Sequence, residues 1–127
     1  RNLDNYVAYV WAEIPGFSRF GSYLGNGSVD GPFVWCGFRP AFVVVKGSNG
    51  TSDWIIHDNL RDPLNPVDRN LYPNASNADT QTGAGRMDFL SNGFKLRTDA
   101  TYNPNVSGVT YIFAAFAEVP FKYANAR

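Results

Sequence analysis

Apolar residues in this chain of 127 residues fall in short runs that turn-forming residues separate. The runs are rich in Val, Ile, Tyr, Phe and Trp, and Gly, Pro, Asn and Asp stand between them, which is typical of strands joined by turns. The pattern predicts strands at residues 5–14, 33–36, 41–46, 53–58, 87–90, 94–98 and 109–119. We therefore expect an all-β fold, an antiparallel, jelly-roll-like β-sandwich with one long ordered loop.

Two Asn-Gly pairs predict tight hairpins. They lie in Ser48-Asn-Gly-Thr51 and in Ser91-Asn-Gly93. Because Asn and Gly tolerate the positive φ that such turns need, each pair favours antiparallel pairing of the strands on either side of it. The predicted partners are 41–46 with 53–58, and 87–90 with 94–98.

The two ends of the chain carry the same strand-like sequence. Tyr6-Val-Ala-Tyr-Val-Trp-Ala-Glu-Ile-Pro15 returns as Tyr111-Ile-Phe-Ala-Ala-Phe-Ala-Glu-Val-Pro120, and such self-similarity is typical of modular proteins. The repeated strand is apolar on both faces, so we expect it to be covered twice, by a second sheet, a neighbouring module or a neighbouring subunit. Residues 1–19 then hold either the closing strand of a preceding module or the first strand of this sandwich, and residues 20–127 form one β-sandwich module. A short central helix is the rival interpretation, but β-branched and aromatic residues favour a strand.

Between Asp58 and Arg86 the chain has three prolines and hardly any periodicity. Loops of this length inside a compact domain are usually functional or disordered. Apolar residues recur along it and predict an ordered excursion that is pinned to the body at Leu60, Leu64, Val67, Leu71 and Tyr72.

Charge and composition exclude several classes of partner. Eleven basic residues offset eleven acidic ones, so we expect no binding to nucleic acid or to an anionic membrane. No apolar stretch approaches the roughly 20 residues of a membrane-spanning helix, so we expect no membrane insertion. The start at Arg1, without Met or a signal pattern, indicates a processed chain or part of a longer protein. Cys36, the single cysteine, is typical of a small buried residue at a strand end.

Candidates for catalysis and metal binding are weak. Glu13 and Glu118 could form the acid pair of a glycosidase, but their equivalent places in the repeat favour a shared structural role. His57 is the only histidine, and no nucleophile-elbow sequence accompanies it. Asp53, His57 and Asp58 are too few for a convincing metal site. We therefore expect no enzyme activity, no metal and no cofactor.

Four Asn-x-Ser/Thr triplets begin at Asn26, Asn49, Asn74 and Asn105. Such triplets accept glycans in secreted eukaryotic proteins. Without a secretory signal, we interpret them as turn residues.

Aromatic residues beside polar loops give the best candidate for ligand binding. Flat rings can stack on sugar faces while charged and amide groups supply directional hydrogen bonds. The candidate residues are Trp54, Asp58, Arg61, Asp62, Tyr72, Asn74 and Tyr102. The alternative is that these rings only pack the loop onto the sandwich.

A set of motifs runs from about Phe20 to the end of the chain. They are Gly25-Asn-Gly-Ser28, Gly37-Phe-Arg-Pro-Ala-Phe-Val-Val-Val-Lys46, Trp54-Ile-Ile-His-Asp58, Leu90-Ser-Asn-Gly-Phe-Lys-Leu96 and Ser107-Gly-Val-Thr-Tyr-Ile-Phe-Ala-Ala-Phe-Ala117. As a set they resemble a domain family of tailed-bacteriophage virion proteins, especially tail-fibre structural proteins, whose function is largely unknown. The resemblance implies a β-rich module on a virus particle, often in tandem copies and in homotrimers, and it carries no catalytic residues.

The repeat and the resemblance together predict a structural and adhesive module of a phage tail fibre or related virion appendage. Its expected partners are other virion proteins, further copies of the chain in a trimer, and a host-surface glycan or protein. Host attachment would use the loop between Asp58 and Arg86, with weak contacts multiplied by linked copies. Two other classes stay open: a capsid or tail decoration protein without receptor binding, and a glycan-degrading tail enzyme.

Overall fold

The computed structural model describes residues 5–49, 51–81, 83, 86–99 and 104–118, and these form an all-β fold. The strands are β1 (Ser18–Leu24), β2 (Phe33–Trp35), β3 (Pro40–Gly47), β4 (Trp54–Asp58), β5 (Arg69–Asn70), β6 (Thr80–Gln81), β7 (Met87–Leu90), β8 (Gly93–Leu96) and β9 (Thr110–Ala117). Every strand pair within the sheets is antiparallel, which confirms the predicted fold class.

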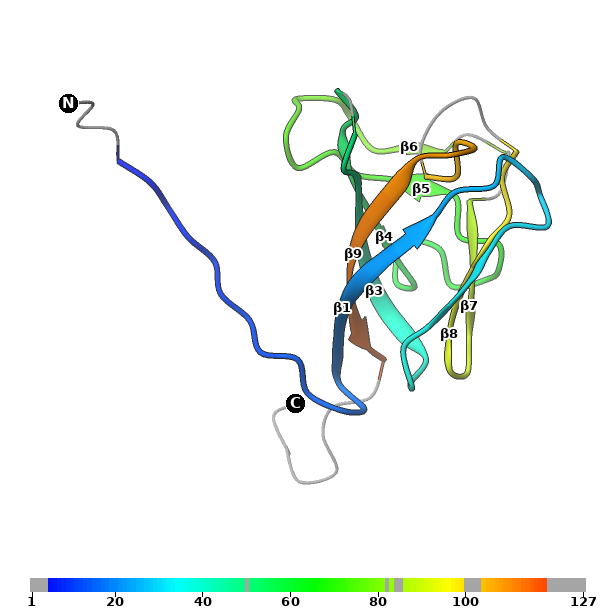
Figure 1. Ribbon diagram of the computed structural model, residues 1–127, viewed down its shortest axis with the longest axis horizontal. Coiled ribbons are helices and arrows are strands. Elements are labelled where there is room, and N and C mark those ends of the chain that lie inside the picture. Colours follow the sequence, from blue (N-terminus) through cyan, green and yellow to red (C-terminus); the bar gives the residue numbers. More distant parts are fainter. Residues whose placement is uncertain (1–4, 50, 82, 84–85, 100–103, 119–127) are drawn as a thin grey trace.

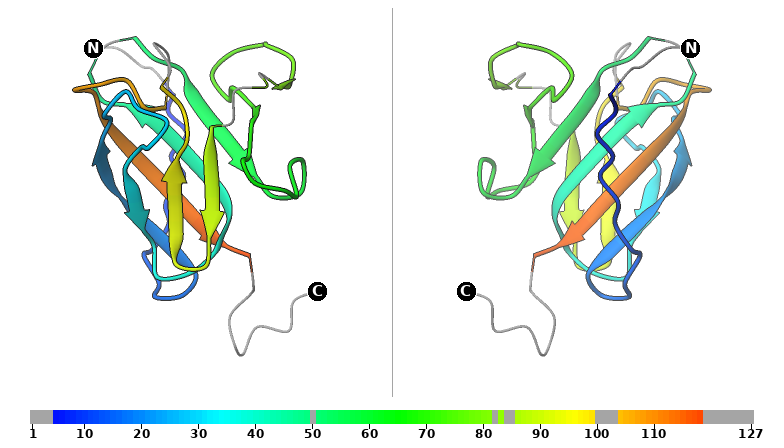
Figure 2. Two further views of the ribbon diagram at one scale, coloured as in Figure 1. Left: turned by 90° about the vertical axis from the view of Figure 1, so that its right-hand side faces the viewer. Right: turned by 90° about the vertical axis from the view of Figure 1, so that its left-hand side faces the viewer.

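Two sheets enclose the core as a sandwich (Figure 2). The larger has the order β1-β9-β3-β4, the smaller has the order β2-β8-β7, and β5 and β6 form a separate small ribbon. Alternate residues of β3 and β9 point inward because side chains alternate across a strand, and they meet the inward residues of β7 and β8. Phe94 and Phe113 make one of these contacts across the core, with ring centroids 5.4 Å apart. Among the described residues, the fully buried apolar side chains include Val43, Met87, Phe94, Leu96, Tyr111 and Ala115.

Local turn chemistry places the hairpins where the sequence predicts them. β3 pairs with β4 and β7 pairs with β8, both in antiparallel register. β9 also confirms a predicted strand, and it lies in the centre of the larger sheet between β1 and β3.

The first strand of the sheet is β1, which the apolar pattern does not reveal. It is rich in Ser and Gly, and Tyr23 is its only buried large side chain. Pairing with β9 creates this strand, since Phe20 and Ser22 lie opposite Ala114 and Ile112. Glycine suits position 21, because a Cβ atom there would lie 3.0 Å from the ring of Phe113, which is tighter than an ordinary contact.

The predicted strand at residues 5–14 is wrong for this chain. Residues 5–13, which we name the arm, pair with no strand of the described structure and run away from the body as an extended segment (Figure 1). A turn at Gly16, with φ of 76°, joins the arm to β1. The Ser18 hydroxyl donates to the Ala12 carbonyl at 2.7 Å and so fixes the base of the arm. The described residues of one chain therefore do not supply the double cover that this segment was expected to have.

The loop between β4 and β7 is ordered over its described residues, but two of its predicted anchors are wrong. Leu60 and Leu64 are 90% and 80% exposed. Val67 is buried and its backbone bonds with Met87, and Leu71 pairs with Ile56. Backbone pairing therefore holds the loop more than its scattered leucines do.

Cys36 is buried, as its sequence surroundings predict. Burial raises the pKa of its thiol to about 12, against an opposing effect of the Arg19 charge. We therefore expect a thiol reagent at neutral pH to leave the native protein unlabelled and to label it fully in denaturant, because the thiolate is the reactive species. Absorbance of a chromogenic disulfide reagent measures both. Fast stoichiometric labelling of the native chain would contradict this placement.

Candidate functional site: an apolar sheet face and its arm

The outer face of the four-stranded sheet is mostly apolar, and its charged residues are Lys46, opposite Trp54 and Ile112, and Asp58, opposite Phe42. The register aligns four residues in one row across the sheet, Phe20, Ala114, Val44 and Ile56. Trp54, Ile112, Phe42 and Phe116 flank this row on the same face. A sheet that meets water on one side normally carries polar residues there. This outer face is instead built like a surface that is to be covered.

The arm rises beside the same face. Its Trp11 ring meets the Phe116 ring edge-on, with centroids 6.3 Å apart, and Tyr9 stacks on Trp11 at 6.1 Å. In Figure 2 the arm, in dark blue, crosses in front of the outer face in the right-hand view. Figure 1 shows the space between arm and sheet widening toward the start of the chain.

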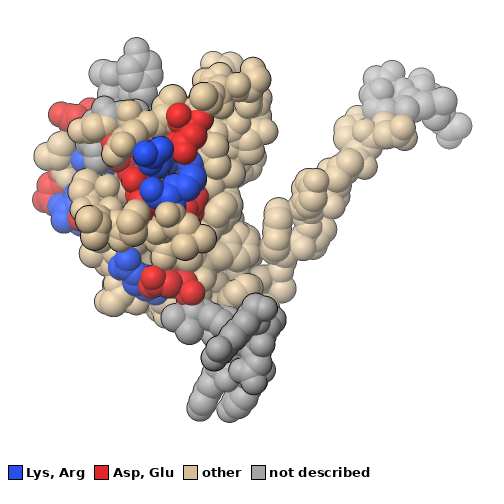
Figure 3. Space-filling model, turned by 180° about the vertical axis from the view of Figure 1, so that it is seen from behind, with Lys and Arg blue, Asp and Glu red and all other residues tan. Residues whose placement is uncertain are grey.

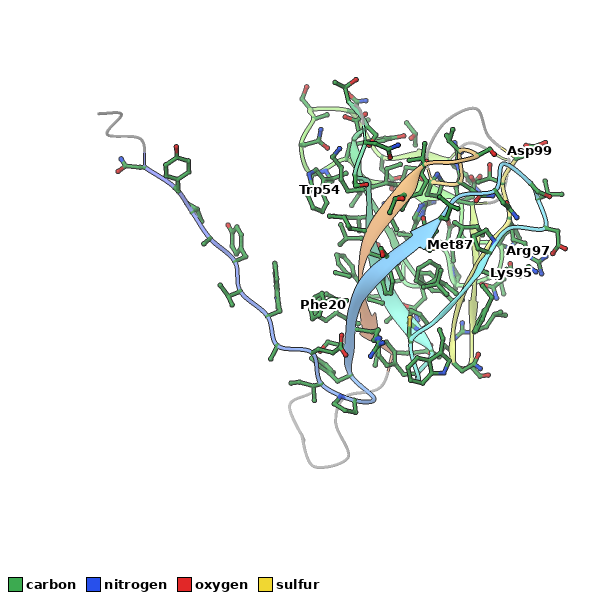
Figure 4. The ribbon with its side chains drawn as sticks, viewed as in Figure 1. Phe20, Trp54, Met87, Lys95, Arg97 and Asp99 are labelled. Atoms are coloured by element: carbon green, nitrogen blue, oxygen red, sulfur yellow. The ribbon has the colours of Figure 1, made fainter. Side chains whose placement is uncertain are left out.

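An apolar groove of about 580 Å³ lies between arm and sheet. Tyr9 and Trp11 line one side of it, Val44 and Ala114 lie on the sheet, and Pro73 comes from the loop after β5. Ala114 is the smallest side chain of its row, so the sheet leaves room there for a large ring. Figure 4 shows Phe20 and Trp54 on the side of the sheet toward the arm.

Aromatic contacts fix the lower end of the groove around Phe116. The rings of Phe17, Phe20 and Phe42 surround it, with centroids 6.2, 5.9 and 6.0 Å from its own. Offset and edge-on aromatic pairs of this kind add to the energy of burial. The arm therefore leaves the body beside a packed aromatic cluster.

The two repeated glutamates each bind an arginine at this end of the molecule. Glu13 lies 2.6 Å from Arg19 and also accepts the Phe20 backbone N–H at 3.2 Å. Glu118 lies 2.7 Å from Arg39 and accepts a hydrogen bond from Asn59 at 3.0 Å. The equivalent positions thus have equivalent partners, as the repeat predicts.

Apart from Glu13, the residues of the arm carry no charge. Figure 3 shows the arm as a tan rod, while the acidic and basic side chains gather on the body. Its rings and branched chains are open to solvent, since Tyr6 is 87%, Val7 81% and Val10 89% exposed. An exposed apolar surface of this extent is typical of an interaction site.

Two of the predicted ligand residues lie at the rim of the groove. Trp54 is 40% exposed, and its backbone N–H donates to the Asn74 side chain at 2.9 Å. The Asn74 amide in turn donates to Asp53 at 2.9 Å. This bonding presents the Trp54 ring beside Pro73 at the groove.

The charged candidates form a separate ionic network within the loop. Arg61 binds Asp58 at 2.6 Å and Asp79 at 3.4 Å. Burial alone would raise the pKa of Asp58, but hydrogen bonds from Arg61 outweigh it and lower that pKa. Asp62 accepts the backbone N–H groups of Asp68 and Arg69. These groups hold the loop together.

The remaining candidates do not join either group. Tyr72 is half-buried against the core and accepts a hydrogen bond from Asn70 at 3.4 Å. Tyr102 lies outside the described residues. The structure therefore brings Trp54 and Asn74 together and separates them from the charged residues.

Metal and membrane sites find no support in the described part of the chain. No group of three or more His, Cys, Asp or Glu side chains gathers there. Helices of the length and apolar character needed to cross a bilayer are absent from the same residues.

Three of the four Asn-x-Ser/Thr asparagines use their side chains within loops. Asn26 accepts the Ser28 backbone N–H at 3.0 Å, and Asn74 binds Trp54 as described. Asn105 is fully buried. Asn26 thus makes a local turn bond as predicted, whereas Asn74 and Asn105 join segments that are distant in the sequence.

The fold and the site define a β-sandwich module with an apolar N-terminal arm. A family model described as a domain of unknown function, DUF7483, matches residues 1–120, and the chain belongs to this family. The matched range includes the arm as well as the sandwich. Neither a curated protein nor a solved structure matches the chain.

Sequence reasoning grouped two of the groove residues, Trp54 and Asn74, and did not bring the others to them. The apolar run Ala41-Phe-Val-Val-Val45 carried a usable signal, because a strand that is apolar at successive positions has two faces to cover. Phe20, which lies on the same outer face and packs against the groove residue Phe116, had no such signal, since β1 itself was not recognisable.

Proposed function

We propose that this chain is a structural module whose role is assembly with further copies and with other proteins of a larger particle. The observation that carries the proposal is the exposed apolar arm beside an apolar sheet face. Removing such surfaces from water gives the main favourable free energy of obligate association.

The proposed setting is a virion appendage such as a phage tail fibre, with the virion as its location. The motifs between Phe20 and Ala117 support this setting by their resemblance to tail-fibre structural proteins. In that setting the partners are other virion proteins and copies of this chain in a homotrimer. Repeated apolar segments suit such an array, because each copy offers its neighbour the same surface.

Host attachment is a second part of the proposal. Trp54 supports it, since its ring is partly exposed at a groove rim where a sugar face or an apolar side chain can stack. The ionic residues of the loop mostly bind one another, so the assembly role has the broader support.

We expect the purified full-length chain to be a multimer. Its molar mass by light scattering over a concentration series should be a multiple of 14.1 kDa, because a solitary copy leaves the arm and the outer face in water. A molar mass of one chain at every concentration would overturn the assembly role.

A further inference from the structure

We infer that, in the assembled protein, the arm lies between the outer face of its own copy and the outer face of a second copy. The inference rests on the proposed assembly role and names the surfaces that perform it. The partner is a second copy of this chain, and its contact is apolar.

The arm has two apolar rows of side chains. Side chains alternate along an extended segment, so Tyr9 and Trp11 share one side and Tyr6 and Val10 share the other. The row of Tyr9 and Trp11 already lines the groove over the arm's own sheet. Figure 4 shows side chains projecting on both sides of the arm backbone.

The arm's own sheet can therefore cover only one of the two rows. Closure of the arm onto that sheet would leave Tyr6 and Val10 in water, where they are 87% and 89% exposed now. A surface on the opposite side of the arm is needed to bury them. Folding of the arm back onto its own sheet therefore cannot bury both rows.

The outer face of the sheet fits an extended apolar segment such as the arm. This face offers a broad apolar area, in which Ala114 is the smallest side chain and aromatic rings surround Phe116 at one end. The contact between Trp11 and Phe116 shows that an arm ring packs on this face. These two residues are also equivalents in the repeat, whereas Tyr9 corresponds to the small Ala114.

A second copy supplies this same face without any further partner. Each copy then contributes one arm and one outer face, and every apolar row has a cover in a closed assembly. Charge does not oppose the approach of residues 6–12, which carry none, and the central row of the outer face, Phe20, Ala114, Val44 and Ile56, carries none either.

The test compares two double substitutions in the full-length chain. Tyr6→Asp with Val10→Asp puts charge on the row that faces the second copy. Leu60→Asp with Leu64→Asp is the matched control, because these residues are equally exposed and apolar but lie in the loop. At protein concentrations low enough for single copies, both variants should unfold like the parent protein.

We expect the arm variant to raise the dissociation constant of the assembly at least about tenfold, since buried apolar and aromatic anchors dominate interfaces. The control should assemble like the parent, as judged by light scattering. Equal assembly of the arm variant and the parent would overturn the inference but leave the assembly role standing. A monomeric parent would overturn the assembly role itself.

Crosslinking tests whether the arm of one copy lies close to the outer face of another copy. One chain carries Val10→Cys in the arm and the other carries Ser22→Cys, which lies on the outer face at the exposed end of β1. A short bismaleimide should join the two variants when they are mixed, whereas Leu60→Cys mixed with Ser22→Cys should stay unlinked. Absence of the mixed product in a multimeric sample would contradict the proposed contact. Cys36 gives little background because it is buried.

Discussion

Replacing Asn105 with alanine is expected to lower the free energy of unfolding by about 3 kcal/mol. The Asn105 side chain is fully buried. Its amide nitrogen lies 2.8 Å from both the Ser28 and the Thr98 carbonyl oxygens, and its oxygen accepts the Asn26 backbone N–H at 3.0 Å. Alanine would leave these buried backbone groups without their partner, and that is more costly than the loss of an exposed hydrogen bond.

Urea unfolding followed by circular dichroism measures this change. The matched control is Asn49→Ala, which alters another asparagine of an Asn-x-Ser/Thr triplet at an exposed turn. It should change the free energy of unfolding by less than about 0.5 kcal/mol. If both substitutions had equal effects, Asn105 would not be the link between these loops that its hydrogen bonds indicate.

Acid is expected to destabilise the protein through His57 between pH 6.5 and about 4, a window that begins above the range where carboxylates titrate. His57 is fully buried and its Nδ1 lies 3.0 Å from the Arg69 carbonyl oxygen. Burial lowers the pKa of His57 from 6.5 to about 4, against the opposing effect of the hydrogen bond that its Nδ1 makes to the Arg69 carbonyl oxygen.

The sign follows from proton binding. Between pH 6.5 and about 4 the unfolded chain binds a proton at His57 that the folded chain does not, so the free energy of unfolding falls as the pH falls. The loss across this window is about 3 kcal/mol, and it is complete once the pH is below the folded pKa.

His57→Asn is the informative comparison. Its amide nitrogen can still donate to the Arg69 carbonyl, but the side chain does not titrate. The variant should be less stable at neutral pH because it leaves a cavity, and its stability should be nearly flat between pH 6.5 and 4. If urea unfolding showed the same loss in both proteins over this window, another group would be responsible. Asp58 is no rival there, because its lowered pKa places its effect at more acidic pH.

Local signals in the sequence predict much of the sheet structure. The Asn-Gly turn places β3 against β4, and the Ser91-Asn-Gly93 turn places β7 against β8. The alternation of buried and open residues in β3 follows from an apolar run, and its inward members Val43 and Val45 form part of the core. These features depend on neighbours in the chain, so the sequence alone suffices for them.

Contacts between distant segments are less accessible. β1 exists because β9 lies beside it, and its sequence of Ser, Arg, Phe and Gly has weak strand preference of its own. The arm has a strong strand pattern but no partner strand within the described chain. The same apolar sequence is a central strand near the C-terminus and an extended arm near the start, because only β9 has β1 and β3 on either side.

The candidate site shows the same division. Residue type suggested that Trp54 and Asn74 lie at a surface for ligands, and both lie at the groove. Residue type could not separate Asp58 and Asp62 from them, because a carboxylate that holds a loop looks like one that binds a ligand. The backbone N–H groups that these two carboxylates accept are visible only in the folded chain.

Hydrogen exchange of the arm amides tests the central claim most directly. The account predicts that peptides covering residues 6–13 are protected from exchange in the assembled protein and lose this protection on dilution to single copies, because assembly buries the arm between two outer faces. Exchange of these amides at the rate of an unfolded chain in a sample that light scattering shows to be multimeric would contradict it.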